Sequence, residues 1–431
     1  ALAVPPFVDW EERRLDLEAA LSGAAGVPVE TRGDIDLRLL PSPRLRVDGI
    51  TLGVPDGASP SVVAQGVVAE MELTALLSGQ IRFRSIAISE ADLRLPMTGG
   101  ALNLPALAAE GADALGALAF DDLAITALSV TTITPEFGPM RRVRLANLRL
   151  GAPSLAGPWR VEGVYAGDRF RLSAGRLDET LAMQIRLVGG ADAALRYDID
   201  ARLQFVRDAV GLRPELSGNG RLSLLPPDSG EPVAFEPVVL SGSFASEGAG
   251  FALADLRFEL GDPALGSQLE GDGFVRLDDP RISLDLTGRR LALDAILAGP
   301  RGGAFMNWLS DASPGAGLPP IDLTLELGSL GFAREELMDA SLRAIIEDGV
   351  LQILHGAISL PGDARVTYAG DIDLSRLDRF SGDLTLTAEN SSRLARYLPQ
   401  LGIDGPWLRL LSGPPLNLSG HVALDDRGFA V

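Results

Sequence analysis

The sequence predicts a mainly β protein, built as one elongated, strongly curved, trough-like antiparallel β-sheet with an N-terminal helix and a few short inserted helices. Three observations lead to this fold class. Segments such as LRYDIDARLQF, RISLDLTG and IDLTLELG alternate with the two-residue period of half-buried strands. The 49 glycines and 29 prolines are spread along the chain, which favours many turns. GDIDL and GDLTL share a pattern in which a strand begins just after a glycine.

The first element is a predicted helix near residues 9–22. Asp9 is its expected N-cap, because a short acidic side chain can accept hydrogen bonds from the first helical N–H groups. Leu15, Leu17 and Leu21 give the helix an apolar side. The glycines that follow, ending with Gly26, predict its C-terminus.

A strand and a hairpin are predicted next, in GDIDLRLLPSPRLRVDGITLG. The first strand is expected to stop at Pro41 and Pro43, because proline cannot donate to a ladder. Alternation resumes at Leu45. Asp48-Gly49 then predicts a tight hairpin turn, since glycine readily adopts the positive φ that such a turn needs.

Breaks in the alternation predict bends and helices further along. Apolar residues change parity near Arg84-Ser85, around Ala127 and around Ala146, so a bulge or bend is expected at each place. Short helical patterns are expected within residues 97–118, 291–309, 334–338 and 393–398.

Composition excludes several classes of chemistry. The chain has no cysteine and no lysine, so thiol nucleophiles, disulfides, cysteine-bound zinc and phosphate-loop or Schiff-base lysines are impossible. The net charge of -20, with scattered arginines, disfavours nucleic acid and anionic membrane surfaces as partners. No run approaches the roughly 20 apolar residues of a membrane span.

No catalytic or metal site is expected. His355 and His421 are distant in sequence and each lies beside a glycine in a strand pattern, which favours a structural role over ligation. Two of the three acidic pairs considered point to the solvated side of alternating strands, and no loop has the spacing of a calcium site. We therefore predict no enzyme activity, no metal and no cofactor. The pairs considered are Asp34/Asp36, Asp278/Asp279 and Asp371/Asp373.

The N-terminal region resembles the AsmA family of bacterial envelope proteins. The similarity lies in Pro28-Val29, the Gly33-Asp34-Ile35 segment, the Leu40 to Pro43 segment and the later LLSG at residues 76–79. Residues 1–95 are the specific part, while GPWRVEGVYAGDRFRLSAGRL and LTGRRLALDAIL resemble the later β-rich part of large AsmA-like proteins.

The resemblance implies a location, partners and a domain division. It implies a periplasmic body anchored to the bacterial inner membrane, kinship with chorein-type bridge proteins, phospholipids as ligands and envelope proteins as further partners. Since ALAVPPFVDW is apolar, we expect the membrane anchor to precede it. We divide the chain into an N-terminal helix (1–26), a chorein-like β module (27–118) and an AsmA-like extended β region (119–431) that is expected to continue the module.

Two functions from different classes remain open. In the first, the apolar side of a curled sheet binds phospholipid acyl chains and supports lipid transport between inner and outer membranes. In the second, the protein is a structural or assembly factor for outer-membrane biogenesis, acting through protein contacts such as strand addition at a free sheet edge. A carbohydrate-binding or hydrolytic role is disfavoured by the aromatic content of 5% and the absent motifs. The predicted lipid-binding residues are Ile282, Leu284, Leu286, Leu323, Leu325, Leu384 and Leu386.

Overall fold

The structure is a computed structural model that forms two compact units, residues 1–219 and 220–431. The boundary falls within strand β12 (Leu212–Leu224). The structure describes residues 13–38, 42–54, 59–74, 82–98, 101–102, 120–134, 138–153, 156–190, 195–207, 212–224, 238–260, 267–277, 279–294, 319–332, 334–374, 380–401, 415–425 and 428–430.

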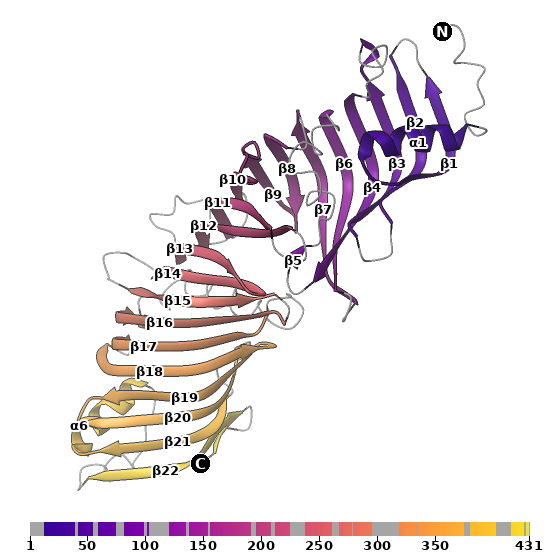
Figure 1. The fold of residues 1–431 in the computed structure, drawn as a ribbon. Helices are drawn as coiled ribbons and strands as arrows, with labels where there is room; N and C mark the ends of the chain where they lie inside the picture. Colours follow the sequence, from indigo (N-terminus) through magenta and orange to yellow (C-terminus); the bar gives the residue numbers. More distant parts are fainter. Residues whose placement is uncertain are drawn as a thin grey trace, which may run out of the picture. The chain divides into compact units, whose positions relative to one another are not determined.

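In the first unit the strands pair in chain order, from β1 to β11 (Figure 1). All pairs in this ladder are antiparallel except β4–β6, and the short β5 pairs only with the end of β4. The strands are β1 (Val29–Arg38), β2 (Arg44–Leu52), β3 (Ser61–Met71), β4 (Phe83–Thr98), β5 (Ala101–Leu102), β6 (Phe120–Thr134), β7 (Gly138–Ala152), β8 (Trp159–Tyr165), β9 (Asp168–Ala174), β10 (Ala182–Gly189) and β11 (Leu195–Arg207).

The second unit repeats this plan from β13 to β23 (Figure 1). Here the single parallel pair is β16–β17. The strands are β13 (Val238–Glu247), β14 (Gly250–Leu260), β15 (Gln268–Arg276), β16 (Arg281–Ala292), β17 (Ile321–Phe332), β18 (Glu335–Glu347), β19 (Val350–Leu360), β20 (Ala364–Asp373), β21 (Phe380–Ala388), β22 (Leu416–Asp425) and β23 (Gly428–Ala430).

The mainly β class is confirmed, and the prediction of a wholly antiparallel sheet is wrong at two places. Each parallel pair follows a long connection, residues 99–119 before β6 and 293–320 before β17. A connection of a dozen or more residues lets the chain return to the same end of the sheet, which a short hairpin cannot do.

Helix α1 (Arg14–Ala25) closes the free edge of β1. The helix extends beyond the predicted residue 22 to Ala25 and ends at Gly26, with φ +70°; the predicted N-cap, Asp9, lies outside the described residues. Side chains spaced four residues apart along α1 lie on one side of the helix, because successive helical turns bring such residues together. On this side they contact the backbone of β1. Arg14 donates to the carbonyl oxygens of Thr31 and Gly33 at 3.0 and 2.8 Å.

The predicted hairpin turn at Asp48-Gly49 is wrong, because β2 runs straight through it. The positive φ lies across the ladder instead, at Gly33 (φ +75°), where the register of β1 and β2 shifts. The Asp48 carboxylate accepts a hydrogen bond from the Asp34 N–H at 3.1 Å. The acidic residue therefore stabilises a bulge in the neighbouring strand rather than a turn in its own.

Two of the three predicted changes of strand phase coincide with irregular pairing. Ser85 and Phe83 oppose the consecutive residues Glu70 and Met71, so Arg84 is an extra residue in β4. Asn147 has φ +50°, and the register of β7 against β8 shifts beside it. Around Ala127 the β6–β7 register does not shift.

The helical predictions for the second unit have different outcomes. The helix predicted over 393–398 is confirmed as α6 (Ser391–Tyr397), followed by the 3₁₀ turn η4 (Leu398–Leu401). The helix predicted over 334–338 is wrong, because those residues open strand β18. Their pairing with the end of β17 outweighs the local helical pattern. Most of the segments 97–118 and 291–309 lie outside the described residues.

Candidate functional site

One side of the second unit's sheet is apolar from strand to strand. We call it the apolar face and define it as the side that carries Leu284. The register places its residues in rows that run across the strands. One row is Gly273, Leu284, Leu323, Ala344, Ile353, Gly370, Gly382 and Val422, and the next is Gly271, Leu286, Leu325, Leu342, Gly356, Tyr368, Leu384 and Gly420.

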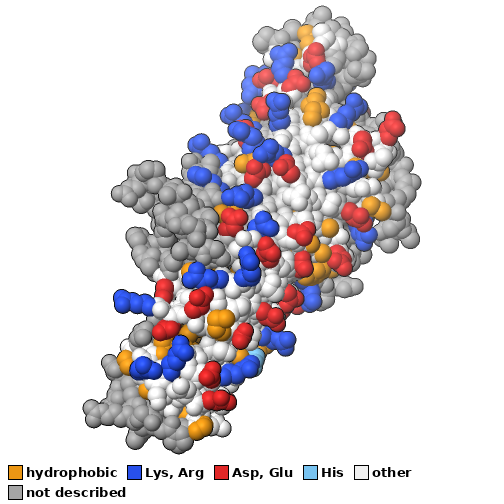
Figure 2. Space-filling model, turned by 90° about the vertical axis from the view of Figure 1, so that its left-hand side faces the viewer, with side chains coloured by type: hydrophobic (Ala, Val, Ile, Leu, Met, Phe, Trp, Pro, Cys, Tyr) orange, Lys and Arg blue, Asp and Glu red, His pale blue; other side chains and the backbone are white. Residues whose placement is uncertain are grey.

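The opposite side of the same strands is polar. A row of Asp272, Asp285, Thr324, Arg343 and His355 runs there between the two apolar rows. The two sides differ because side chains alternate across a strand. In the view of Figure 2, arginine and acidic side chains are interspersed, and the visible hydrophobic side chains stand mostly singly.

All seven predicted lipid-binding residues lie on the apolar face. The five on β16 and β17 are brought together, as Ile282, Leu284 and Leu286 of one strand lie beside Ile321, Leu323 and Leu325 of the next. The two on β21, Leu384 and Leu386, are separated from them by strands β18, β19 and β20. Leu286 is buried at 5% exposure, and the other six are half-buried.

A hollow of about 320 Å³ opens on the apolar face over strands β16 to β20. Gly356 lies in its lining, and a Cβ added there would meet its nearest neighbour, Ile353, at 3.4 Å, which is ordinary van der Waals contact. The lining is almost wholly hydrophobic. It includes Leu291, Leu325, Leu330, Leu342, Ile353, Ile358 and Val366.

Sequence reasoning missed most of this lining. Ile353 and Ile358 have opposite parity in VLQILHGAISL, yet both line the hollow. The register of β19 against β20 shifts between Ile353 and Gly356. A bulge at Leu354-His355 therefore brings Ile358 to the same side of the sheet as Ile353. The sequence signal that could have predicted this bulge is the pair of short alternating runs on either side of His355-Gly356.

Helix α6 covers the apolar face beside this hollow. Leu394 is 0% exposed and packs in a cluster with Ala364, Ala388 and Leu398, against which Leu360 and Leu386 also pack. The Tyr397 hydroxyl donates to the Phe332 carbonyl oxygen at 3.3 Å. The helix thus connects β21 to the end of β17, and Leu386 belongs to the covered part of the face.

The hydroxyl of Tyr368 lies over two glycines, Gly370 in its own strand and Gly382 in the neighbouring strand β21. A Cβ added at Gly370 or Gly382 would come within 2.7 or 2.8 Å of its hydroxyl. Burial, followed by the nearby Asp371 carboxylate, raises the pKa of Tyr368 above its ordinary value of 10.0. The phenol therefore stays neutral on a surface that carries no charge.

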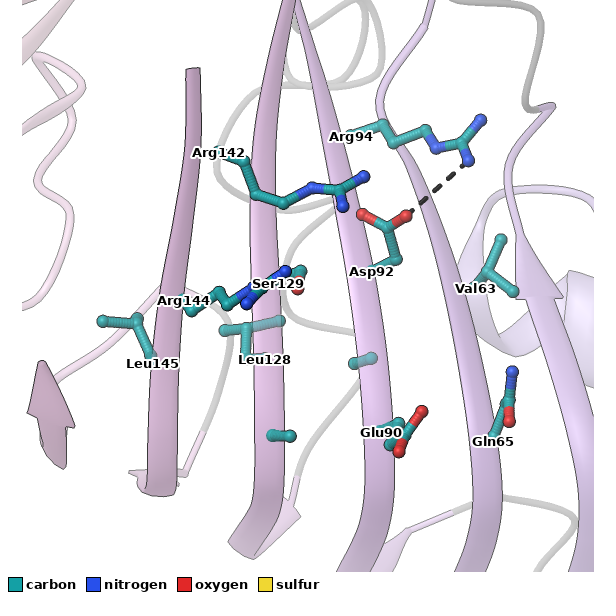
Figure 3. Close-up of a pocket in the computed structure, with 12 residues that line it drawn as sticks. Val63, Gln65, Glu90, Asp92, Arg94, Leu128, Ser129, Arg142, Arg144 and Leu145 are labelled. Atoms are coloured by element: carbon teal, nitrogen blue, oxygen red, sulfur yellow. Dashed lines mark ion pairs between the residues drawn. The ribbon is translucent and has the colours of Figure 1, made fainter. Parts of the chain in front are cut away.

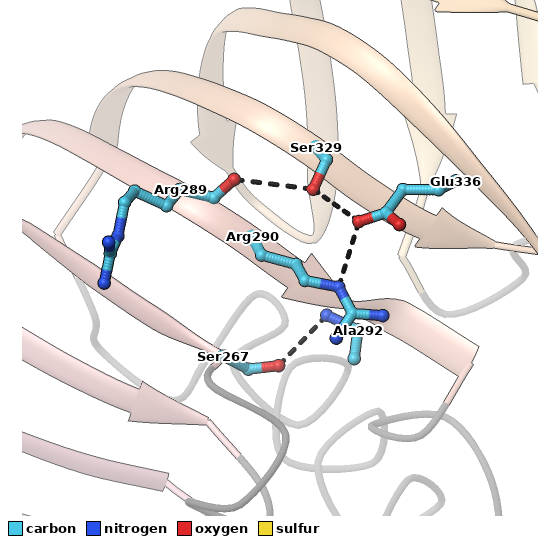
Figure 4. A network of polar contacts seen from close by, with 6 residues as sticks. All are labelled: Ser267, Arg289, Arg290, Ala292, Ser329 and Glu336. Carbon is cyan, nitrogen blue, oxygen red and sulfur yellow. Dashed lines mark hydrogen bonds and ion pairs between the residues drawn. The ribbon is translucent and has the colours of Figure 1, made fainter.

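A polar network holds the parallel joint near the C-terminal ends of β16 and β17 (Figure 4). The Glu336 carboxylate accepts from the Ser329 hydroxyl at 2.8 Å and from Arg290 Nε at 3.0 Å. The Ser329 hydrogen bond, followed by the charge of Arg290, lowers the pKa of Glu336 below its ordinary value of 4.5. The network ties β16, β17 and β18 together at the place where the parallel pair interrupts the antiparallel order of the sheet.

His421 forms a short relay on the polar side. Its Nε2 lies 3.1 Å from Ser381 Oγ and its Nδ1 lies 3.1 Å from Asp383 Oδ1. This connectivity is that of a Ser-His-Asp relay, but the His421 and Asp383 side chains are 61% and 86% exposed. None of these three residues lines the apolar hollow over strands β16 to β20. This exposure differs from the water-excluded surroundings in which such relays usually act.

The acidic pair Asp34/Asp36 has ordinary contacts within the first unit. Asp36 pairs with Arg38 at 3.0 Å, and Asp34 is part of the β1 bulge. Asp278 lies outside the described residues. Within the described part of the chain, no group of three His, Asp or Glu residues is arranged to hold a metal ion.

Comparison with known proteins addresses the resemblance directly. The model of the AsmA family matches residues 1–117. This match supports the assignment of the protein to the AsmA family. The matched region contains α1 and strands β1 to β5, in the first unit. A search of curated proteins found no match.

Membership of the AsmA family suggests a role connected with the cell envelope. In the described part of the chain, none of the helices has both the length and the apolar character that a membrane crossing requires.

Proposed function

We propose that this AsmA-family protein binds phospholipid acyl chains along the apolar face and supports lipid transport between the inner and outer membranes. The observation that carries the proposal is the continuity of the face. Its two central rows cross eight strands, from β15 to β22, and contain no charged residue. A surface of this kind suits a long ligand without polar groups.

The chemistry of acyl chains matches the side chains of the face. Leucine, isoleucine and valine offer no directional contacts, and burial of each methylene contributes about 0.8 kcal/mol, whatever its position along the chain. A ligand held in this way can move along the rows without breaking hydrogen bonds. We propose that the sheet curls around the ligand as a trough.

The remaining parts of the proposal rest on the family and on composition. We propose a periplasmic location at the inner membrane, which the envelope role of the family favours. We also propose that the protein is a carrier and not an enzyme, because the chain has no cysteine or lysine and its one histidine relay is exposed.

The alternative is an assembly factor that recruits other proteins by strand addition. It needs an open sheet edge. At β1 this edge is occupied by the side chains of α1, which bond the backbone of Val29, Thr31 and Gly33. This observation favours the lipid carrier over strand addition at that edge.

Native mass spectrometry of the gently purified protein tests the proposal, with thermal unfolding measured in parallel. We expect bound phospholipid in the parent, and loss of lipid with retained folding in Leu284→Asp, Leu323→Asp and Leu384→Asp. A carboxylate on the face has to lose its hydration when an acyl chain covers it. Thr385→Asp, on the polar side between Leu384 and Leu386, is the matched control and should keep its lipid.

Two results would contradict the lipid carrier. One is a parent that never carries lipid, even after exposure to phospholipid vesicles. The other is unfolding of all three aspartate variants, which would indicate that the face is a closed core with buried unpaired charge.

A further inference from the structure

A second hollow, of about 500 Å³, lies in the first unit over strands β3, β4, β6 and β7. Its character is the opposite of the apolar hollow. Gln65, Glu90 and Ser129 contribute neutral or acidic polar groups, and Arg94, Arg142 and Arg144 contribute three positive charges (Figure 3). No step of the proposed lipid binding uses these residues.

The ladder explains why the charged groups meet. Arg94, Thr131 and Arg142 form one row across β4, β6 and β7, and Asp92, Ser129 and Arg144 form the next. In each row an arginine of β7 faces the hollow from one side. Figure 3 shows the guanidinium groups of Arg142 and Arg94 on either side of the Asp92 carboxylate.

The three arginines are only weakly engaged. Arg94 lies 3.6 Å from Asp92 Oδ2, which is longer than a good charged hydrogen bond. Arg142 donates from Nε to Thr131 Oγ1 at 3.4 Å. Neither Arg142 nor Arg144 has an ion pair with a described residue. Guanidinium groups in this state are suited to an incoming oxyanion, which they can bind through two parallel N–H donors.

Asp92 places a second requirement on the ligand, in addition to the negative charge that the arginines favour. Its Oδ1 atom is buried and has no hydrogen-bond partner, which is costly for a carboxylate oxygen. Its neighbour along the strand on the same side, Glu90, brings another acceptor to the hollow. A ligand that satisfies this site must therefore bring an N–H or O–H donor as well as an anion.

We propose that this hollow is a binding site for a small zwitterion that joins a phosphate to a primary ammonium group. The phosphate pairs with Arg142 and Arg144, and the ammonium donates to Asp92 Oδ1. The same chemistry occurs in a free amino-phosphate and in a lipid head group. The proposal is independent of acyl-chain binding, because it concerns other residues in the other unit.

Isothermal titration with three soluble probes tests the assignment. O-phosphoethanolamine carries both groups, phosphocholine has no N–H donor, and inorganic phosphate has no cation. We expect O-phosphoethanolamine to bind most tightly. The double variant Arg142→Gln/Arg144→Gln should weaken it by at least about tenfold, because two charged hydrogen-bonding groups are lost. Arg149→Gln, an exposed arginine further along β7, is the matched control and should change nothing.

Asp92→Asn separates a zwitterion site from a simple anion site. We expect it to remove the preference for O-phosphoethanolamine over phosphocholine and to improve binding of inorganic phosphate, since a repelling charge is lost. Circular dichroism and thermal unfolding confirm that each variant is folded. The proposal is overturned if the parent does not bind O-phosphoethanolamine, or if it binds all three probes alike and Asp92→Asn changes none of them.

Vesicles identify the source of the ligand once soluble binding is established. Vesicles of phosphatidylethanolamine are compared with vesicles of phosphatidylcholine for the parent and the double arginine variant. Preference for the first, lost in the variant, assigns a membrane lipid head group. Soluble binding without such a preference assigns a free amino-phosphate.

Discussion

Glu18 Oε1 accepts two hydrogen bonds from Thr31, one from its backbone N–H and one from its hydroxyl, both at 2.7 Å. The neighbouring turns of α1 act in the same way, as Arg14 bonds the Thr31 carbonyl oxygen at 3.0 Å and Ser22 Oγ accepts from the Val29 N–H at 2.9 Å. An unpaired strand edge is a template for association with another chain. Helix α1 therefore occupies the positions that a further strand would use.

We expect Glu18→Ala to lower the free energy of unfolding by about 1–3 kcal/mol, because the Thr31 N–H is left without its acceptor. The opened edge should also allow self-association. Chemical denaturation and concentration-dependent light scattering measure the two effects. Glu30→Ala, which removes the same charge from an exposed position of β1, is the control. A monomeric Glu18→Ala protein of parental stability would contradict this role of α1.

The stability contribution of Glu336 should depend on pH with a definite sign. Its folded pKa lies below the ordinary value of 4.5, so the contribution is present above that value and is lost as the pH falls through the folded pKa. Urea unfolding of the parent and of Glu336→Gln, compared between neutral pH and about pH 3, measures it. The difference between the two proteins should shrink in acid, and a difference that does not change with pH would argue against the charged network.

Ser329→Ala provides a second view of that network. The Ser329 hydroxyl is the first cause of the lowered pKa of Glu336, so its removal should bring that pKa closer to 4.5. The carboxyl pKa can be followed by nuclear magnetic resonance titration. An unchanged pKa of Glu336 in Ser329→Ala would indicate that Arg290, and not Ser329, is the main cause of the lowered pKa.

Filling the apolar hollow should displace lipid without adding charge. A Cβ at Gly356 has ordinary contacts, so Gly356→Leu should fold with a stability change of about 1 kcal/mol while lowering bound lipid in mass spectrometry. Ala369→Leu adds similar bulk to the exposed polar side and should leave lipid binding unchanged. Equal lipid content in Gly356→Leu and the parent would place the ligand elsewhere.

Helix α6 should depend on one leucine. Leu394→Ala deletes a side chain that is 0% exposed and should lower the free energy of unfolding by about 2–5 kcal/mol. Hydrogen exchange should then increase in α6 before it increases in β20 and β21. Uniform protection across these elements would show that α6 is not a separately opening cover.

Alternation along single strands was sufficient to predict on which side of the sheet the seven candidate residues lie, although most residues that line the hollow were not predicted. Leu284, Leu323 and Leu384 were predicted from their own segments and lie on one side of the second unit's sheet. This is possible because the facing of a side chain depends mainly on its position within its own strand. The residue pattern of the N-terminal region likewise predicted the resemblance to the AsmA family, and the family match over residues 1–117 confirms this resemblance.

Local pattern failed where a distant strand or a bulge decides the outcome. Asp48-Gly49 has the signature of a turn, yet its carboxylate bonds the bulge beside Gly33, which is remote in sequence. Residues 334–338 have a helical pattern, yet they pair with the end of β17. In β19 the bulge at Leu354-His355 reverses parity and brings Ile358 to the side of Ile353.

The sequence by itself determined the alternation within many strands and the apolar side of β16, β17 and β21, because these properties arise from neighbours along the chain. The tertiary structure alone decided the parallel joints at β4–β6 and β16–β17, the closure of the β1 edge by α1, and the meeting of Asp92 with Arg142 and Arg144. These features depend on register between strands that are distant in sequence. Register is a property of paired strands, and no single strand contains it.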